Sequence, residues 1–423
     1  MDKVVFFFVV CFALVLNIEA QDWPRWRGFS QDGVVRQAGL DLDWSVEKPS
    51  LSWTFRQAGS GYSAPVIVGS TLYCAGAENG NTFAFALDVN TGKLKWRQVI
   101  GPQFDHDHGN GPRGSVTVDG DRLYLIQGGG QIHCLSVIDG KIVWQKDFGK
   151  DFNGKIQSGW GYSESALVDG DLVICTPGGD DGTMIALNKK TGSLVWRTKG
   201  WTDEAGYSTP IVVEVDGVRQ YIQQSSKSVV GVSVDGKLLW KVEIESYNNP
   251  NNRVRAVVPT PIYHNNTVYV TAGYRAGCEK VRIVRSGDVF NATTVYANSN
   301  MINQHGGVVL INGHIYGYSD NNAWTCQNLE TGEIVWTQRN KGEGKGTLIG
   351  VNDRLILLNE TNGALTLIAA TPEGWKEYGK MMLPERTGIM TQSNAVWTHL
   401  VVVSGKLFVR DHDLLFCFDL KKQ

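Results

Sequence analysis

The chain has little net charge of either sign. It has 423 residues, with 40 Lys and Arg against 42 Asp and Glu, and a formal net charge of −2. Because no basic cluster stands out either, the sequence gives no support for nucleic-acid binding, which needs a positively charged face. Charged residues are also few, at 19%, whereas 42% of the residues are hydrophobic. That composition excludes a disordered chain and favours a folded, globular one.

Long hydrophobic runs are missing after the first 20 residues. Residues 4–18 form such a run behind Lys3, and the small residue Ala20 follows. This is the pattern of a secretory signal peptide over residues 1–20. A membrane anchor is the alternative, but the run is short for a spanning helix, which needs about 20 apolar residues. We therefore expect a mature chain without a transmembrane segment, exported to the periplasm or the extracellular space.

Helical periodicity is missing too, and a strand pattern recurs in its place. Each copy has a small residue, an apolar residue, a turn with Gly and then a strand that carries Trp. The Trp residues of the clear copies are Trp96, Trp144, Trp196, Trp240 and Trp336. They are spaced by roughly 50 residues, except that the last interval is about twice as long and leaves room for one degenerate copy over residues 281–296. A period of this length indicates a propeller or a solenoid.

The periods also contain two-residue hairpin signals, in which both residues tolerate a positive φ. Examples are Asp119-Gly120, Asp169-Gly170, Asp216-Gly217 and Asn312-Gly313. Four short antiparallel strands per period make a β-propeller blade. We therefore predict an all-β fold, a propeller built from four-stranded antiparallel blades.

The two ends of the repeat region determine the number of blades. Seven periods cover about residues 62–380, and residues 396–420 supply three more strands but no outer, Trp-bearing one. Residues 51–55, which include Trp53, form an outer strand that has no blade before it. If these two pieces pair, the ring closes with eight blades and leaves no open strand edge. The predicted organisation is a signal peptide (1–20), an N-terminal extension (21–50) and the propeller (51–423).

The Trp on the outer strand of a blade has a structural role in this prediction. Packed over the neighbouring blade, it would bury roughly 150–250 Å². We interpret the whole row as core rather than as a ligand cage, and its members are Trp53, Trp96, Trp144, Trp196, Trp240 and Trp336.

The repeat resembles that of a known family. The segment Asp88-Val89-Asn90-Thr91-Gly92-Lys93-Leu94-Lys95-Trp96 is similar to the repeat of the quinoprotein, or PQQ-like, propellers. Residues 22–28 and 111–120 resemble a secreted bacterial branch of these proteins that is often described as similar to the outer-membrane assembly factor BamB. The resemblance implies eight blades over nearly all of the mature chain. It implies no particular activity, because a fold does not determine a function.

The chain departs from both branches of this resemblance. Many PQQ-dependent alcohol dehydrogenases carry two adjacent cysteines and long insertions that build the quinone and calcium site. Here no two cysteines are adjacent, and no Cys-x-x-Cys-His haem motif occurs. The lipid-attachment cysteine of BamB is missing as well. We therefore assign no catalytic residue, predict no cofactor, and keep PQQ only as an unsupported alternative.

The cysteines follow the repeat. Cys134, Cys326 and Cys417 occupy a slot that holds small residues in other copies, and Cys74 and Cys175 share a second slot. The first three belong to blades that are not adjacent, so they cannot cross-link. We interpret these residues as small buried side chains with free thiols, even in an exported protein.

The loops that precede the innermost strands of the blades, here called the leading loops, are expected to surround one mouth of the central channel. A concave surface built from several blades is the default binding site. Such a ring of side chains could hold a sugar, a quinone or a peptide loop. The candidate ligand-binding residues are Tyr62, His106, His108, Arg113, Trp160, Tyr162, Glu164, Tyr207, Arg253, Arg255 and His305.

Two of these candidates suggest a metal site. His106 and His108 are two residues apart, so an extended segment would place both imidazoles on one face. Together with a carboxylate from another loop they could bind Zn²⁺ or Cu²⁺. The alternative is a polar loop in water.

The sequence thus favours an exported, non-catalytic propeller of the cell envelope. It would bind a protein, a glycan or another polymer at the channel mouth, or scaffold an envelope assembly. Two alternatives remain open, a quinoprotein-type oxidoreductase and a carbohydrate-binding propeller. We expect a monomer, although no feature of the sequence determines the oligomeric state.

The thiols provide the first test. Titration of the denatured, unreduced mature protein with a thiol reagent should find all six cysteines that follow residue 20, because none is expected to be paired. A count of fewer than four would contradict the assignment of these residues to buried repeat slots.

Overall fold

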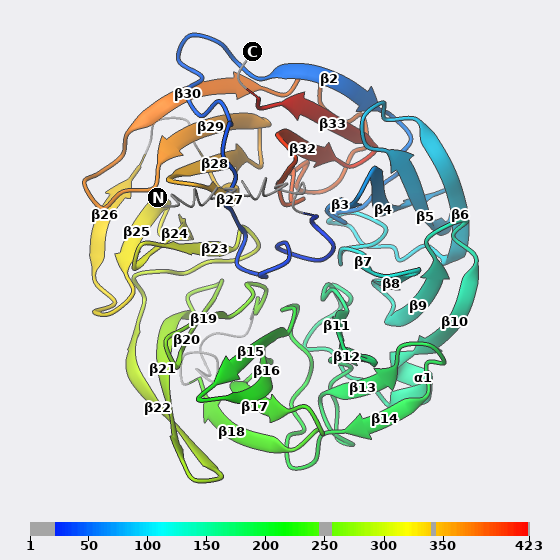
Figure 1. Ribbon diagram of the computed structural model, residues 1–423, viewed down its shortest axis with the longest axis vertical. Helices are drawn as coiled ribbons and strands as arrows, with labels where there is room; N and C mark the ends of the chain where they lie inside the picture. Colours follow the sequence, from blue (N-terminus) through cyan, green and yellow to red (C-terminus); the bar gives the residue numbers. More distant parts are fainter. Residues whose placement is uncertain (1–21, 245–255, 340–343, 422–423) are drawn as a thin grey trace, which may run out of the picture.

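The computed structural model describes residues 22–244, 256–339 and 344–421. The predicted signal peptide lies outside these residues, and so do Arg253 and Arg255. Eight separate sheets stand around a central channel and form a β-propeller, as the sequence predicts (Figure 1). Within the described part of the chain, no helix has the length and hydrophobicity needed to cross a bilayer.

Each blade is one antiparallel sheet whose strands follow the chain order. Blade 1 consists of β3 (Val66–Val68), β4 (Thr71–Glu78), β5 (Asn81–Asp88) and β6 (Leu94–Pro102). Blade 2 consists of β7 (Thr117–Asp119), β8 (Arg122–Ile126), β9 (Gln131–Ser136) and β10 (Ile142–Asp147), and the short helix α1 (Phe148–Phe152) follows it. Blade 3 consists of β11 (Leu167–Asp169), β12 (Leu172–Cys175), β13 (Ile185–Asn188) and β14 (Leu194–Arg197).

The next three blades repeat this order. Blade 4 consists of β15 (Ile211–Val215), β16 (Val218–Gln224), β17 (Ser228–Ser233) and β18 (Leu238–Glu243). Blade 5, the degenerate copy, consists of β19 (Ile262–His264), β20 (Thr267–Ala272), β21 (Gly277–Ser286) and β22 (Val289–Asn298). Blade 6 consists of β23 (Val308–Ile311), β24 (His314–Ser319), β25 (Ala323–Asn328) and β26 (Ile334–Gln338).

The last two blades take up strands from the start of the chain. Blade 7 consists of β27 (Gly346–Val351), β28 (Arg354–Asn359), β29 (Ala364–Ala369) and β30 (Glu377–Met382), with β1 (Val34–Val35) added in parallel beside β27. Blade 8 consists of β31 (Val401–Val403), β32 (Lys406–Asp411), β33 (Leu414–Asp419) and β2 (Ser50–Phe55). Since β2 pairs antiparallel with β33 and sets Trp53 opposite Cys417, the predicted closure of the ring is confirmed.

The hydrophobic core lies between blades. One cluster joins Val66 and Ala84 of blade 1 to Val116 and Leu125 at blade 2, and equivalent clusters occupy the later interfaces. A sheet with two buried faces needs apolar residues on both, which explains the continuous apolar runs of the middle strands. The outer strands have one exposed face and are more polar.

The predicted role of the outer-strand Trp residues is confirmed for five of them. Each indole N–H donates to a backbone carbonyl in the next blade's turn between its third and fourth strands. The bonds run from Trp53 to Val89 (3.1 Å), Trp96 to Val137 (2.9 Å), Trp144 to Lys189 (3.0 Å), Trp196 to Val234 (3.0 Å) and Trp336 to Thr371 (2.8 Å).

The glycine of the repeat lies directly under this indole. At Gly192, with φ +70°, a Cβ atom would lie 2.7 Å from the ring of Trp144. Gly92 and Gly140 stand in the same relation to the indoles of the preceding blades. Glycine is therefore required in this turn for two reasons. It adopts the positive φ without strain, and it has no side chain to collide with the indole ring.

Three blades deviate from this arrangement. Trp240 donates instead to Gln220 of its own blade (2.8 Å) and packs over Gly231, so the predicted contact is wrong in this detail. In blade 5 Tyr296 replaces the indole and donates to the carbonyl of Leu329 (2.9 Å). In blade 7 the slot holds a glycine, and the buried Trp44 from the N-terminal segment fills the space above it.

Residues 22–44 lie across the ring rather than beside it (Figure 1). We call residues 22–41 the hub, because their hydrogen bonds reach seven blades. In blades 1, 2, 4, 5, 6, 7 and 8, in that order, the pairs are Trp23–Ile67, Pro24–Val118, Gln31–Pro210, Trp26–Thr260, Arg27–Val308, Gly33–Gly350 and Asp41–Leu420. In five of these blades the hub satisfies a backbone group in or next to the innermost strand. In blade 5 the partner is the side-chain hydroxyl of Thr260, and in blade 8 it is a carbonyl that follows β33.

A buried arginine joins the last blade to the first. Arg410 on β32 is fully buried, and burial lowers the pKa of its guanidinium. It donates to the carbonyl oxygens of Ala58, Gly59, Ser63 and Ala75, all in or before blade 1. Because charge-assisted bonds to several carbonyls are strong, this side chain reinforces the closure made by β2.

The cysteines behave as the repeat predicts. All six in the described residues are buried and free, and none is paired with another. Cys134 and Cys326 lie opposite Trp144 and Trp336, at the position where other blades carry alanine.

The indole contacts lead to a stability prediction. Trp144→Ala should lower the free energy of unfolding by about 3–5 kcal/mol, because it removes a large buried side chain and a bond between blades. Val143→Ala, on the same strand but with a 44% exposed side chain, is the control and should cost less than about 0.5 kcal/mol. Chemical denaturation of both variants would measure the difference, and equal stabilities would contradict the role of the indole.

Candidate functional site

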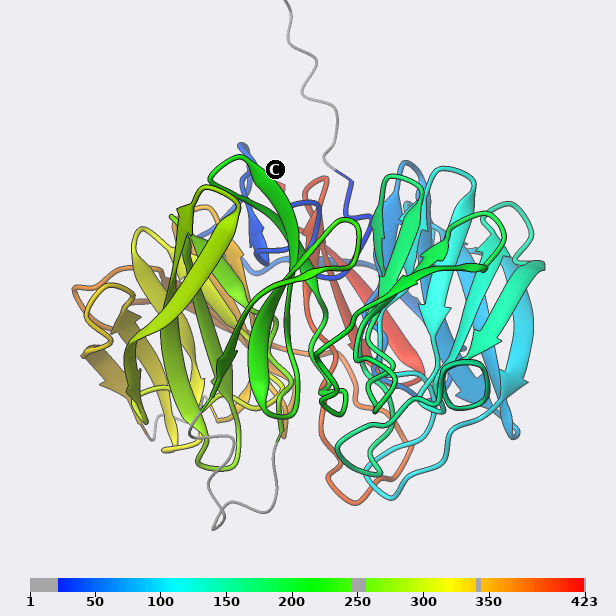
Figure 2. The same cartoon turned by 90° about the horizontal axis from the view of Figure 1, so that it is seen from below.

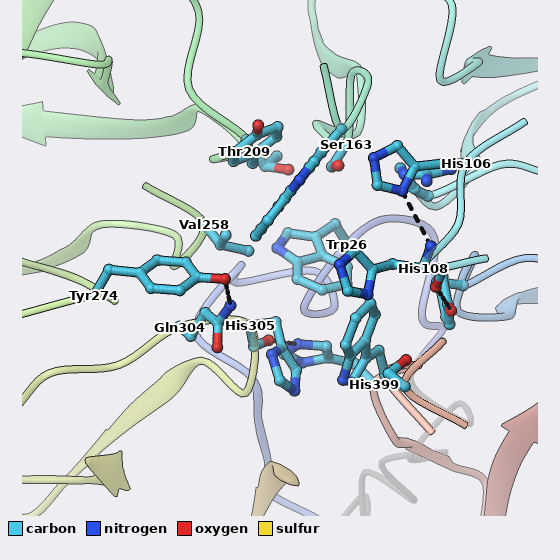
Figure 3. A pocket seen from close by; sticks show the side chains of 16 residues that line it. Trp26, His106, His108, Ser163, Thr209, Val258, Tyr274, Gln304, His305 and His399 are labelled. Atoms are coloured by element: carbon cyan, nitrogen blue, oxygen red, sulfur yellow. Dashed lines mark hydrogen bonds between the residues drawn. The ribbon is translucent and has the colours of Figure 1, made fainter. Parts of the chain in front are cut away.

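One cavity of about 310 Å³ opens among the leading loops at the end of the channel (Figure 3). In Figure 2 the longest of these loops lie at the bottom, and the N-terminal segment lies toward the opposite end of the channel. The side chains that line the cavity come from seven blades and from the hub. They are Trp26, Tyr62, His106, His108, Arg113, Trp160, Ser163, Tyr207, Thr209, Val258, Tyr274, Gln304, His305, Ser393, Trp397 and His399.

Most of the predicted site residues meet around this cavity. Those that line it are Tyr62, His106, His108, Arg113, Trp160, Tyr207 and His305. They lie far apart in the chain and belong to the leading loops of five blades. The propeller brings them together by placing these loops at the same end of the channel.

Two predicted residues face elsewhere. Tyr162 packs edge-on against Phe148 (ring centroids 5.1 Å apart) and donates to the carbonyl of Pro177, between blades 2 and 3. Glu164 is buried and accepts the backbone N–H of Thr176 (2.6 Å). Side chains alternate along this extended loop, so Ser163 faces the cavity while its two neighbours face the core. Including these two in the site was therefore wrong.

Several lining residues were missing from the prediction. Trp26 belongs to the hub, and its position under the channel could not be read from local pattern. Trp397 and His399 lie in the leading loop of blade 8, and comparison with the other leading loops would have found them. Tyr274 comes from the turn between β20 and β21 and not from a leading loop.

The aromatic rings of the cavity are held in place by one another. Trp160 stacks on Tyr207 with centroids 6.2 Å apart and planes 24° apart, and Tyr274 lies 5.9 Å from Trp160. Trp26 meets His399 edge to face at 4.5 Å. Such pairs restrict the rings before any ligand arrives, so binding costs less side-chain entropy.

The charged groups near the cavity are already hydrogen-bonded to other groups of the protein. His305 Nε2 lies 2.6 Å from Glu360 Oε2, which also accepts the indole N–H of Trp397 (3.0 Å). Burial raises the pKa of Glu360, but the hydrogen bond and charge of His305 outweigh it and bring the pKa below its usual value. Arg113 donates to the carbonyls of Gly109 and Gly111, and burial lowers its pKa to about 10.

The metal hypothesis is not supported by the arrangement of ligands. His106 and His108 do lie close together, with ring centroids 5.5 Å apart. However, Nδ1 of His106 accepts the backbone N–H of His108 (3.2 Å), which is drawn in Figure 3. Across residues 22–244, 256–339 and 344–421, no three His, Cys, Asp or Glu side chains are grouped to hold an ion. The third ligand that the prediction required is therefore missing there.

The cavity also does not suit PQQ, the cofactor of the quinoproteins whose repeat this chain resembles. PQQ carries three carboxylates, and the only arginine among the described lining residues directs its nitrogens at backbone carbonyls. The described lining holds no Asp or Glu that could bind a companion cation. We therefore derive no chemistry through this cofactor.

The sequence comparisons agree with the resemblance that the repeat indicated. The family described as "Outer membrane protein assembly factor BamB" matches residues 84–338, which is more than half of the chain. The chain belongs to this family. The BamB of Yersinia pestis is 22% identical over 324 residues, covering 73% of this chain and 75% of that protein. The BamB of Kangiella koreensis is 30% identical over 177 residues, covering 41% and 39%.

Solved structures confirm the fold of this BamB-family chain. BamB from Moraxella catarrhalis superposes with a TM-score of 0.62 at 14% identity, covering 89% of this chain and 99% of that one. A quinohemoprotein alcohol dehydrogenase from Comamonas testosteroni gives 0.61 at 12% identity, covering 95% and 81%. At such identities the likeness establishes the propeller and nothing about activity.

Glu164 leads to a pH prediction. Burial raises its pKa to about 8, so the folded protein holds it protonated while the unfolded chain ionises near 4.5. Stability from this group is present at pH 4 and is lost as the pH rises through 8. The stability of Glu164→Gln, which stays neutral, should therefore rise relative to the parent between these pH values, by on the order of 5 kcal/mol at most.

Denaturation of both proteins at several pH values would measure this gain. Glu204→Gln, which removes an exposed carboxylate from a neighbouring loop, is the control and should show no such trend. A difference between parent and Glu164→Gln that does not change with pH would contradict a protonated Glu164.

Proposed function

We propose that this chain is an exported, non-catalytic propeller that binds a macromolecule of the cell envelope at the cavity between the leading loops. Its family supports a role in assembly rather than catalysis, because the curated relatives bear the name of an outer membrane protein assembly factor. The signal-peptide pattern supports export.

The observation that carries the proposal is a preformed aromatic cavity without a catalytic group of side chains. Its hydroxyls are engaged away from the imidazoles. Ser163 donates to the carbonyl of Gly161, Thr209 accepts the backbone N–H of Ser165, and Ser393 pairs with Thr391. Tyr62 donates its hydroxyl to the backbone carbonyl of His108, not to the ring. In the described residues no lining hydroxyl is hydrogen-bonded to a histidine ring, which a nucleophile activated by an imidazole base would need.

The test is retention of an envelope component. Tagged protein would be purified from the envelope of its own cell as the parent, as Trp160→Ala and as Phe29→Ala. The last variant removes an aromatic ring that is 65% exposed and does not line the cavity, so it serves as the control. We expect one component to be held by the parent and by Phe29→Ala and to be reduced at least tenfold with Trp160→Ala.

Two results would overturn this proposal. One is that no retained component distinguishes Trp160→Ala from the other two proteins. The other is dye reduction with alcohols or sugars after addition of PQQ and Ca²⁺, which would make the chain an oxidoreductase.

A further inference from the structure

We propose that the cavity binds the end of a neutral saccharide chain, one or two sugar rings deep. This inference rests on the proposed function and specifies the ligand of the same site. It follows from the charge of the cavity, from its polar atoms and from its closed floor.

The first observation is that the described lining offers an ionised ligand no ready partner, because it contains no Asp, Glu or Lys and its one arginine directs its nitrogens at backbone carbonyls. The guanidinium of Arg113 is bound to the carbonyls of Gly109 and Gly111 at 2.9 and 2.8 Å. Glu360 lies behind His305 and Trp397 and is bound to both. An ionised ligand would lose its hydration without gaining a partner, so the ligand is uncharged.

The second observation is that the rings are accompanied by polar atoms. Tyr274 accepts from Gln304 Nε2 (2.9 Å), which leaves its own hydroxyl proton to donate (Figure 3). His106 accepts a backbone N–H at Nδ1, so its neutral ring carries the proton on Nε2. A hydrocarbon side chain would bury these donors without partners, at about 1–3 kcal/mol each. A sugar would satisfy them with its hydroxyls.

The third observation concerns the ring faces. Trp160 is supported from behind by Tyr207, and it is only half-buried in the empty cavity. The C–H face of a pyranose is apolar and can pack on an indole while the hydroxyls at its rim bond to neighbouring groups. A neutral ring with an apolar face and a polar rim therefore matches both kinds of lining group.

The fourth observation is that the cavity is blind. Trp26 lines it and also lines a second cavity of only about 10 Å³ on the hub side. Its indole is fixed by a bond to Thr260 (2.8 Å). Because the hub crosses the channel here, a polymer cannot thread through the ring. A volume of about 310 Å³ is near the lower limit for ligand sites, so it suits a chain end.

Calorimetry and tryptophan fluorescence with the purified mature protein would test this. The neutral probes are maltose, maltotriose, cellobiose, galactobiose, mannobiose and N,N′-diacetylchitobiose. Each binding sugar is then compared with its uronic-acid counterpart and with a cyclic oligosaccharide of the same unit, which has no end. We expect at least one linear neutral sugar to bind, and at least tenfold weaker binding of the charged and cyclic forms.

Two variants locate the binding. Trp160→Ala removes the indole platform and should weaken the sugar at least tenfold. Tyr274→Phe keeps the ring and removes only the hydroxyl, so it tests the site even if the first variant folds poorly, and it should weaken binding several-fold. Phe29→Ala again serves as the control and should bind as the parent does.

The outcomes separate this inference from the proposed function. If N-acetyltryptophanamide binds and the sugars do not, the cavity takes an apolar side chain and the inference is wrong. If no probe binds while Trp160→Ala still releases the envelope component, the inference is wrong and the proposed function stands. Sugar binding that neither variant weakens would place the ligand elsewhere and would also overturn it.

Discussion

The structure depends on one repeated interaction, the bond from an outer-strand indole to a backbone carbonyl of the next blade. Propeller blades are separate sheets and share no strand hydrogen bonds, so contacts between blades must hold the ring together. The indole supplies a large apolar surface and one directional bond, and the glycine beneath it makes room for the ring. In blade 5 Tyr296 replaces the indole and donates to the next blade, and in blade 7 Trp44 fills the space above a glycine. Blade 4 is different, because its Trp240 donates within its own blade.

The second constraint is closure. Strand β2 near the start of the propeller pairs with β33 near its end, and Arg410 joins blade 8 to the carbonyls around blade 1. The hub makes hydrogen bonds to seven blades. The same hub closes the channel beneath the cavity. A segment required for stability thus also determines the depth of the pocket, because Trp26 belongs to both.

The propeller fold determines which loop side chains line the cavity. The leading loops emerge at the same end of the channel, so seven blades contribute side chains without any need for rearrangement. The aromatic rings support one another, and the carboxylate of Glu360 lies behind them, in contact with His305 and hydrogen-bonded by Trp397. A rigid, aromatic and partly polar pocket of this kind is suited to recognising a ligand.

The sequence by itself determined the strand pattern, the eight blades, the ring closure and the buried thiols. These features depend on local turn chemistry and on recurring apolar strand segments, both of which can be read along the chain. Only the tertiary structure decided which loop side chains face the channel, why Tyr162 and Glu164 turn into the core, and that Trp26 and Trp397 complete the cavity. Those choices depend on contacts between segments far apart in the chain, and no local pattern encodes them.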